Sequence, residues 1–195
     1  MATEIVQEII TEPFNVYVAP VGTAFPALTT EESGFATAWT KLGAQVSKSY
    51  SEAGVTVAHT QTPASFQPAG STVPRKWWRT DEGMTIALEL ADLTTTTYAL
   101  IMDNATVTHV TGSPGTKSFQ VKRGNVIHPF ALLARGPSPE YENHFSQYQV
   151  PVAYQTGNPT PKYALKGGPA FLAVTFSVAE GEPNKFAEFV VQTSS

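Results

Sequence analysis

Residues 84–91 read Met-Thr-Ile-Ala-Leu-Glu-Leu-Ala, an alternation of large aliphatic side chains with small or polar ones. Successive side chains of a β-strand point to opposite faces, so this period of two predicts a strand with one apolar face and one small-residue face. An ordinary solvent-exposed face would carry several Lys and Glu residues. A face that is kept small and almost uncharged indicates a surface that lines a channel or packs against other copies of the chain.

Two other segments repeat this alternation. Residues 172–179 alternate Leu, Val, Phe and Val with Ala, Thr, Ser and Ala, and residues 55–62 do so more weakly. Segment 67–74 is rich in Pro and Gly and separates a strand expected at 54–66 from one expected at 75–91. We therefore predict a long β-hairpin, whose strands exceed the usual length of about five or six residues. A hairpin that reaches past its own core needs a partner surface.

The composition is typical of a turn-rich β protein, with 15 prolines, 14 glycines and only 14% charged residues. The length of 195 residues fits one domain, 1–195. We predict a mainly β fold, an antiparallel β-sandwich or rolled barrel with a long β-hairpin and one flanking short α-helix. Its expected parts are an N-terminal arm (1–33), a long hairpin region (44–91), a short helix (92–104) and the remaining strands (125–191). Within the last part, strands are expected at 125–135, 144–155, 168–180 and 185–191.

The helix at 92–104 is the least clear of these elements. Asp92 is a suitable N-cap, and Leu93, Thr97 and Leu100 share one helical face. The four consecutive threonines at 94–97 favour a strand instead, because β-branched side chains are stiff at χ1. We predict a short helix here.

No combination of residues in the sequence predicts catalysis. The chain has no cysteine, which excludes disulfides and thiolate chemistry. None of the four histidines has the spacing of a metal site, and the acidic pairs lie in turn-like sequence. We therefore expect no catalytic residue, no metal site, no cofactor and no enzymatic activity. The histidines are His59, His109, His128 and His144, and the acidic pairs are Glu31/Glu32, Asp81/Glu82 and Glu140/Glu142.

The run Arg75-Lys76-Trp77-Trp78-Arg79 interleaves basic and aromatic residues. Such residues can stack on bases and contact phosphates, but a formal net charge of -4 argues against a dedicated nucleic-acid binder. Trp and Arg are also the enriched anchors of protein interfaces. We predict that Trp77, Trp78 and Arg79 belong to a subunit interface, with packing into the core and contact with nucleic acid as the alternatives.

The order of these features resembles the major tail tube proteins of long-tailed (siphovirus-type) bacteriophages. The resemblance covers roughly residues 14–182, and each of its motifs is loose when taken alone. The motifs are Trp39-Thr-Lys-Leu-Gly43, Glu52-Ala-Gly-Val-Thr-Val57, the return strand Arg75–Leu90 with Asp81-Glu82-Gly83, the helix-like Leu93–Asn104, Ala131-Leu-Leu-Ala-Arg-Gly136, Tyr163-Ala-Leu-Lys-Gly-Gly-Pro169 and Ala179-Glu180-Gly181.

The resemblance implies a structural virion protein that self-assembles into stacked hexameric rings and forms the tail tube, a conduit for DNA ejection. It implies that long hairpins of neighbouring subunits join into an inner barrel and that the N-terminal arm bridges stacked rings. The implied partners are further copies of the chain, the tape measure protein, the tail terminator and the distal tail or baseplate proteins. Genomic DNA would pass through the lumen without specific binding.

We expect the protein to reside in the virion tail after synthesis in the host cytoplasm, without a membrane. The start of the chain lacks signal-peptide features, and no apolar run approaches the ~20 residues of a membrane span.

On this interpretation the small face of the hairpin lines the lumen. Glu89 is then either an ordinary surface charge or one member of an acidic ring that repels phosphates. The residues expected to face the lumen are Thr56, Ala58, Thr60, Thr85, Ala87 and Glu89.

Three other classes remain open. One is a carbohydrate- or receptor-binding β-sandwich module of a virion or secreted protein, which would show clustered aromatics near carboxylates or amides. Another is an enzyme, which would need a convergent catalytic set. The third is a ring protein of a contractile injection or secretion system, which would share the architecture.

Overall fold

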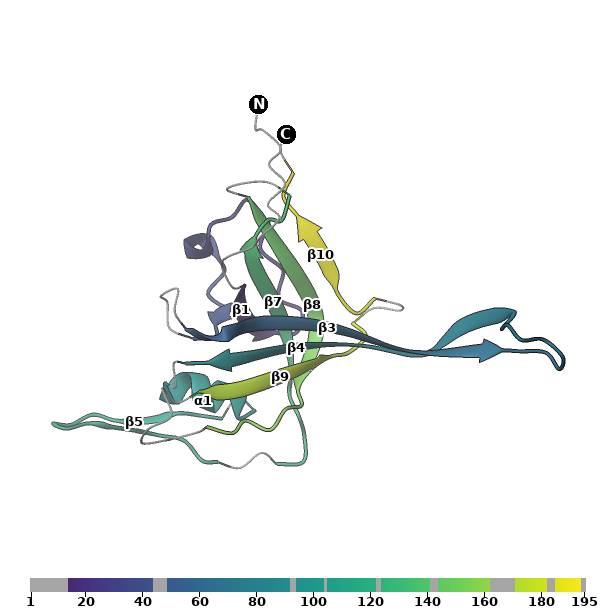
Figure 1. Ribbon diagram of the computed structural model, residues 1–195. Helices are drawn as coiled ribbons and strands as arrows, with labels where there is room; N and C mark the ends of the chain where they lie inside the picture. The colour runs from purple at the N-terminus through teal and green to yellow at the C-terminus, as the bar shows by residue number, and fades with distance from the viewer. Residues whose placement is uncertain are drawn as a thin grey trace.

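The computed structural model describes residues 14–43, 49–91, 94–103, 105–121, 124–140, 144–161, 171–181 and 185–193. These residues form a large antiparallel sheet, a separate two-stranded hairpin and one α-helix (Figure 1). The large sheet has the strand order β2-β1-β7-β8-β9-β4-β3, and β10 pairs with β8. Its strands are β1 (Asn15–Pro20), β2 (Thr40–Lys41), β3 (Tyr50–Phe66), β4 (Lys76–Leu90), β7 (Pro129–Pro137), β8 (Phe145–Gln155), β9 (Leu172–Val178) and β10 (Glu188–Val191). The remaining elements are η1 (Glu32–Gly34), α1 (Thr95–Ile101), β5 (Thr108–Val110) and β6 (Thr116–Ser118).

The large sheet folds over on itself in a sandwich-like arrangement. β9 pairs with β8 at Ala153–Gln155, whereas β10 pairs with β8 at Ser146–Gln149. Figure 1 shows β3, β4 and β9 running across β1, β7 and β8. Apolar side chains of both groups meet in one core cluster, in which Ile86, Leu132 and Phe176 are at most 2% exposed. The predicted mainly β antiparallel fold with a long hairpin and one short helix is confirmed.

The described residues do not close this sheet into a barrel. The two outermost strands, β2 and β3, are not paired with each other. The side chain of Tyr50, at the start of β3, reaches the other end of the sheet instead: its hydroxyl accepts a hydrogen bond from Val16 N of β1 at 2.9 Å and donates one to the Leu42 carbonyl, just after β2, at 2.9 Å. Burial raises the pKa of Tyr50 to about 12, so the phenol stays protonated and can donate.

We expect Tyr50→Phe to lower the free energy of unfolding by about 1–3 kcal/mol, because Val16 N–H and the Leu42 carbonyl lose a buried partner. A folded-state pKa above the ordinary value of 10.0 stabilises the protein below pH 10, and this contribution is lost as the pH rises to about 12. Denaturant unfolding at pH 7 and at pH 11 should therefore show a smaller loss of stability with pH in the variant. Equal stability of the two proteins at both pH values would contradict the bridging role.

The opposite face of β1 and β7 is also covered, by residues 21–39. Tyr17 and Leu133 pack there against Trp39, whose indole Nε1 donates to the Ala24 carbonyl at 3.1 Å. Burial on both faces explains why β7 is almost continuously apolar rather than alternating.

A buried arginine of β7 holds this covering segment in place. Arg135 is 1% exposed and donates to the carbonyls of Leu28 and Thr30, each at 2.7 Å. Its guanidinium carbon lies 4.2 Å from the ring centroid of Phe145. Burial lowers the pKa of Arg135 from its ordinary high value, against the opposing pull of nearby acidic side chains. The arginine therefore ties residues 28–30 to the sheet through their backbone carbonyls. Among the described residues, no carboxylate lies within ion-pair distance of it.

Several boundaries differ from those predicted. The hairpin strand expected at 54–66 begins earlier, at Tyr50, and the strand expected at 125–135 begins only at Pro129. Residues 15–20 of the expected N-terminal arm form β1 inside the sheet, between β2 and β7, while residues 1–13 lie outside the described residues.

The predicted helix is shorter than expected. It spans α1 alone, and its N-cap is Thr94, whose hydroxyl accepts from Thr97 N at 3.1 Å. The cap expected at Asp92 lies outside the described residues. The small hairpin of β5 and β6 was not predicted.

Candidate assembly surfaces

The small residues of three neighbouring strands form one continuous face. Strand register places Thr56 beside Ala87, and Ala87 beside Thr175 of β9. One step along, Ala58 lies beside Thr85, and Thr85 lies beside Ser177. Because side chains alternate, the aliphatic partners on the same strands point into the core. This small face consists of Thr56, Ala58, Thr60, Thr85, Ala87, Glu89, Ala173, Thr175 and Ser177.

The six residues expected to face a lumen therefore share a single surface. Three further members on β9 were not among the predicted site residues. Their own alternation was visible in the sequence, but the pairing of β9 with β4 was not. Glu89, opposite Ala173, is an exposed acidic residue on this otherwise uncharged face. Whether the face lines a channel stays a prediction.

The strand next to this face has an unpaired edge. β3 is 17 residues long and pairs with β4 on one side only. It ends the strand order of the sheet, and in the part of the chain that the structure describes no strand covers its other side. An exposed edge of this length presents backbone N–H and C=O groups that can pair with another chain. The edge is therefore a second candidate surface for self-association.

The far half of the hairpin extends well beyond the body of the protein (Figure 1). Trp77 and Trp78 lie there opposite Ser65 and Ala64, and they are 63% and 44% exposed. The alternative that these tryptophans pack into the core is therefore wrong. Arg79 is held on the hairpin, with its Nε 2.7 Å from Gln61 Oε1. Their assignment to a subunit interface stays a prediction.

The acidic pairs do not resemble catalytic dyads. Glu31 and Glu32 lie at η1, where Glu32 accepts from Asn15 Nδ2 at 2.9 Å and contacts Lys41 Nζ at 3.4 Å. Burial by itself raises the Glu32 pKa, but the Tyr17 hydroxyl, the Lys41 ammonium and the Asn15 amide together lower it below the ordinary value. A general acid at neutral pH needs the opposite shift. Glu32 is therefore an ionised surface partner.

The other acidic pairs are also unlike catalytic groups. Asp81 and Glu82 are exposed on the hairpin, and Glu140 is exposed after β7, whereas Glu142 lies outside the described residues. No group of three metal-ligating side chains occurs among the residues that the structure describes.

His128 has a specific partner. The Asp103 carboxylate accepts from His128 N at 2.8 Å and lies 2.9 Å from His128 Nδ1. Asp103 adopts a left-handed backbone with φ of 66° at the end of α1. This contact ties the end of α1 to the start of β7, so its role is structural.

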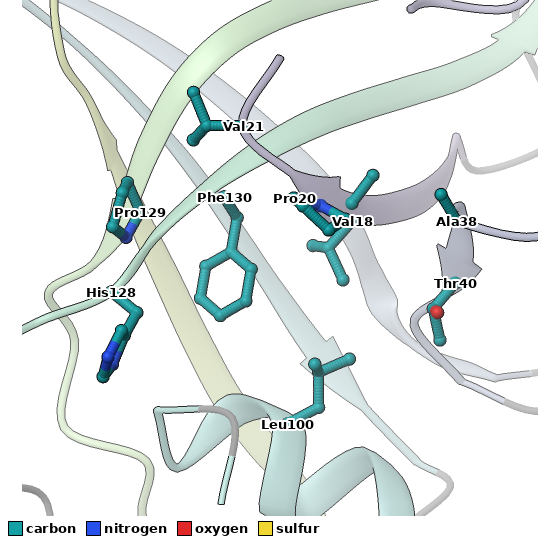
Figure 2. A pocket seen from close by; sticks show the side chains of 10 residues that line it. Val18, Pro20, Val21, Ala38, Thr40, Leu100, His128, Pro129 and Phe130 are labelled. Atoms are coloured by element: carbon teal, nitrogen blue, oxygen red, sulfur yellow. The ribbon is translucent and has the colours of Figure 1, made fainter. Parts of the chain in front are cut away.

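Beside this contact, a shallow groove of about 490 Å³ opens next to β1 (Figure 2). Figure 2 shows Phe130 and Leu100 side chains in it, with His128 at one side. The lining is mostly apolar, with Thr40 and His128 as its polar side chains, and these two alone do not form the convergent set that would fix a polar substrate.

The chain matches no family model and no curated protein. The α-helix that the structure describes is too short to cross a membrane, and no described helix meets the requirements of a membrane span.

Proposed function

We propose that this protein is the structural subunit of a phage-type tail tube, which self-assembles into stacked hexameric rings around a channel for DNA. The observation that carries the proposal is the continuous small face of β3, β4 and β9 next to the unpaired edge of β3. The proposed partners are further copies of the chain, a tape measure protein, and terminator and baseplate proteins at the tube ends. DNA is transient cargo rather than a bound ligand.

Ring closure explains why such an edge is tolerated. A strand edge of 17 residues is an aggregation hazard in a monomer, but pairing in a closed ring removes it. The small face then turns toward the axis, where Thr and Ala offer DNA little to hold. Six copies of Glu89 form an acidic ring that repels phosphates, so that the polyanion slides without sticking.

Negative-stain electron microscopy of the purified protein at increasing concentration tests this proposal. We expect rings, or tubes of stacked rings, with an open bore. A protein that stays strictly monomeric at high concentration and does not polymerise would overturn it. A binding module would give that monomeric result.

We expect Glu89→Lys to leave the fold and the assembly intact but to make the bore retain DNA. Glu89 is exposed on a strand whose core contacts come from the opposite face, so the substitution disturbs no packing. A ring of six lysines contacts phosphates, and about six such contacts give binding that weakens by roughly 1,000-fold or more between 50 and 200 mM salt. The measurement is salt-dependent retention of double-stranded DNA by assembled tubes, together with DNA delivery by tails carrying the variant.

Glu89→Gln is the matched control, because it removes the charge without reversing it. This control should show at most slight DNA retention. Assembled Glu89→Lys tubes that neither retain DNA nor slow its delivery would exclude Glu89 from the bore.

A further inference from the structure

Residues 21–39, here called the strap, cover one face of β1 and β7 without belonging to the large sheet. The structure describes all of these residues, and of them Trp39 alone is buried. Among the described residues, the backbone hydrogen bonds of the strap stay within it or reach Pro20, whereas β1 and β7 pair along their lengths. A segment with few buried side chains and no backbone pairing to the strands beneath it has low local stability.

The strap packs on an apolar cluster of its own. Trp39 lies there with Tyr17 and Leu133, and Phe25 and Phe35 of the strap pack against them. These residues are not part of the main core cluster, which joins the two groups of strands on the other face of β1 and β7. Movement of the strap away from the sheet would therefore uncover the second cluster and leave the main core in place.

Contacts inside the strap hold it together. The Trp39 indole Nε1 donates to the Ala24 carbonyl at 3.1 Å, and the ring centroids of Trp39 and Phe25 are 5.4 Å apart. These contacts join the two ends of the strap next to the pairing of β1 with β2, which fixes both ends to the sheet. The strap can therefore move as one body about its base while β1 and β2 stay paired.

Two buried side chains of the sheet donate to backbone carbonyls of the strap. Gln147 Nε2 donates to the Pro26 carbonyl at 2.9 Å. Arg135 donates to the carbonyls of Leu28 and Thr30, each at 2.7 Å. Arg135 and Gln147 are partners in the register of β7 and β8, and they are 1% and 0% exposed. They therefore form one row of donors that receives alternate carbonyls of the strap.

The strap also supplies most of the groups that compensate the charge of Arg135. Besides the two carbonyls, the Phe35 ring centroid lies 5.2 Å from the guanidinium carbon, and Glu31 and Glu32 attract the cation. From the sheet comes the Phe145 ring, at 4.2 Å. Taking a cation out of water is costly, and in an open state water would solvate it again. The closed strap is therefore a balance between these contacts and the desolvation of Arg135.

We propose that the strap opens and closes as a unit over an intact sheet, and that Arg135 and Gln147 form the lock that keeps it closed. Opening exposes the apolar cluster on β1 and β7 together with the guanidinium, while β3, β4 and β9 keep their pairing. This device is a property of the single chain and does not depend on the proposed tube.

Hydrogen exchange of the unmodified protein, followed by mass spectrometry below the concentration of assembly, tests the opening. Peptides from the strap should exchange through an opening whose free energy depends little on denaturant, because it exposes little surface. Peptides from β4 and β9 should exchange through global unfolding, which depends steeply on denaturant. The same steep dependence in the strap and in both strands would overturn the proposal.

Two substitutions test the lock. Arg135→Met should accelerate exchange in the strap by about 100-fold or more, because two hydrogen bonds from a charged group are lost and two carbonyls lose their donor. Gln147→Met removes one neutral hydrogen bond and should accelerate it by about tenfold. Peptides from β4 and β9 should keep their protection in both variants. Unchanged strap exchange in Arg135→Met, or an equal loss of protection in the strands, would exclude such a lock.

Gln155→Met is the matched control. Gln155 is 5% exposed, and its Nε2 also donates to a backbone carbonyl, that of Gly157 at 2.8 Å, which lies outside the strap. Exchange in the strap should be the same in this variant as in the unmodified protein. An acceleration as large as that of Arg135→Met would show a general loss of stability and would overturn the assignment of the lock.

Discussion

Ile86→Glu should leave the chain unfolded, whereas Ala87→Glu should give a folded protein. The two residues are neighbours on β4, but their side chains point to opposite faces. Ile86 is 0% exposed and lies in the main core cluster, in contrast to Ala87, which is partly exposed on the small face. A carboxylate at 86 has no partner in an apolar core.

The expected difference is large. Burying an unpaired charge costs several kcal/mol even after the structure relaxes, and loss of the Ile side chain adds to this. Native domains are stable by only about 5–15 kcal/mol, so the core variant has little or no stability left. Circular dichroism and thermal melting should show a cooperative transition for Ala87→Glu and none for Ile86→Glu.

Ile86→Val is the control for the core position, and it should cost about 0.5–1.5 kcal/mol. A cooperative transition for Ile86→Glu at a temperature close to that of the unmodified protein would show that the aliphatic face, not the small face, is the one that can be exposed. The assignment of the two faces would then be reversed.

Removal of the hairpin tip, taken here as residues 63–80, should abolish assembly and spare the fold. Thr62 and Asp81 are paired in the register, so residues 63–80 can be replaced by an Asn-Gly turn that connects these strands. The removed segment contributes no buried residue, because the buried residues of β4 begin at Met84. We expect a melting temperature within a few degrees of the original and a complete loss of rings and tubes at concentrations where the full chain assembles.

Fluorescence gives an independent check on the fold of this shortened protein. Of the three tryptophans only Trp39 remains, and it is 8% exposed, so its emission should be that of a buried indole. A matched control replaces only residues 68–73 with Gly and Ser, which keeps both strands and both exposed tryptophans, and it should still assemble. Rings formed by the protein without its tip would rule out any need for the hairpin in self-association.

Local patterns in the sequence predicted the elements that repeat over several residues. The period of two in 84–91 and in 172–179 appears as buried and exposed positions of β4 and β9, because alternation is a property of each strand alone. The breakers in 67–74 likewise predicted the turn of the hairpin. β7 lacked alternation because both of its faces are covered, and a local pattern does not show which segment covers it.

The sequence predicted only part of the small face of β3, β4 and β9, because local patterns show which residues of one strand share a face but not which strands pair. Six of its members lie on the two strands of one hairpin, and a hairpin brings its own strands together. The three residues of β9 belong to this surface only because β9 pairs with β4. That pairing connects segments far apart in the sequence, since Ala87 and its partner Thr175 are 88 positions apart. The exposure of Trp77 and Trp78 also depended on how far the hairpin extends past the core. The residues next to the tryptophans in the sequence do not determine that length.

The sequence by itself determined which strands form, which face of each is apolar and where the hairpin turns, since these follow from short-range side-chain periodicity and breakers. Only the tertiary structure decided that β1 lies inside the sheet, that the small face is continuous over three strands, and that the far half of the hairpin projects beyond the body. Those features depend on register and on long-range contacts such as that between Arg135 and Thr30, which are 105 residues apart. Such contacts form only after folding has brought segments distant in the sequence together.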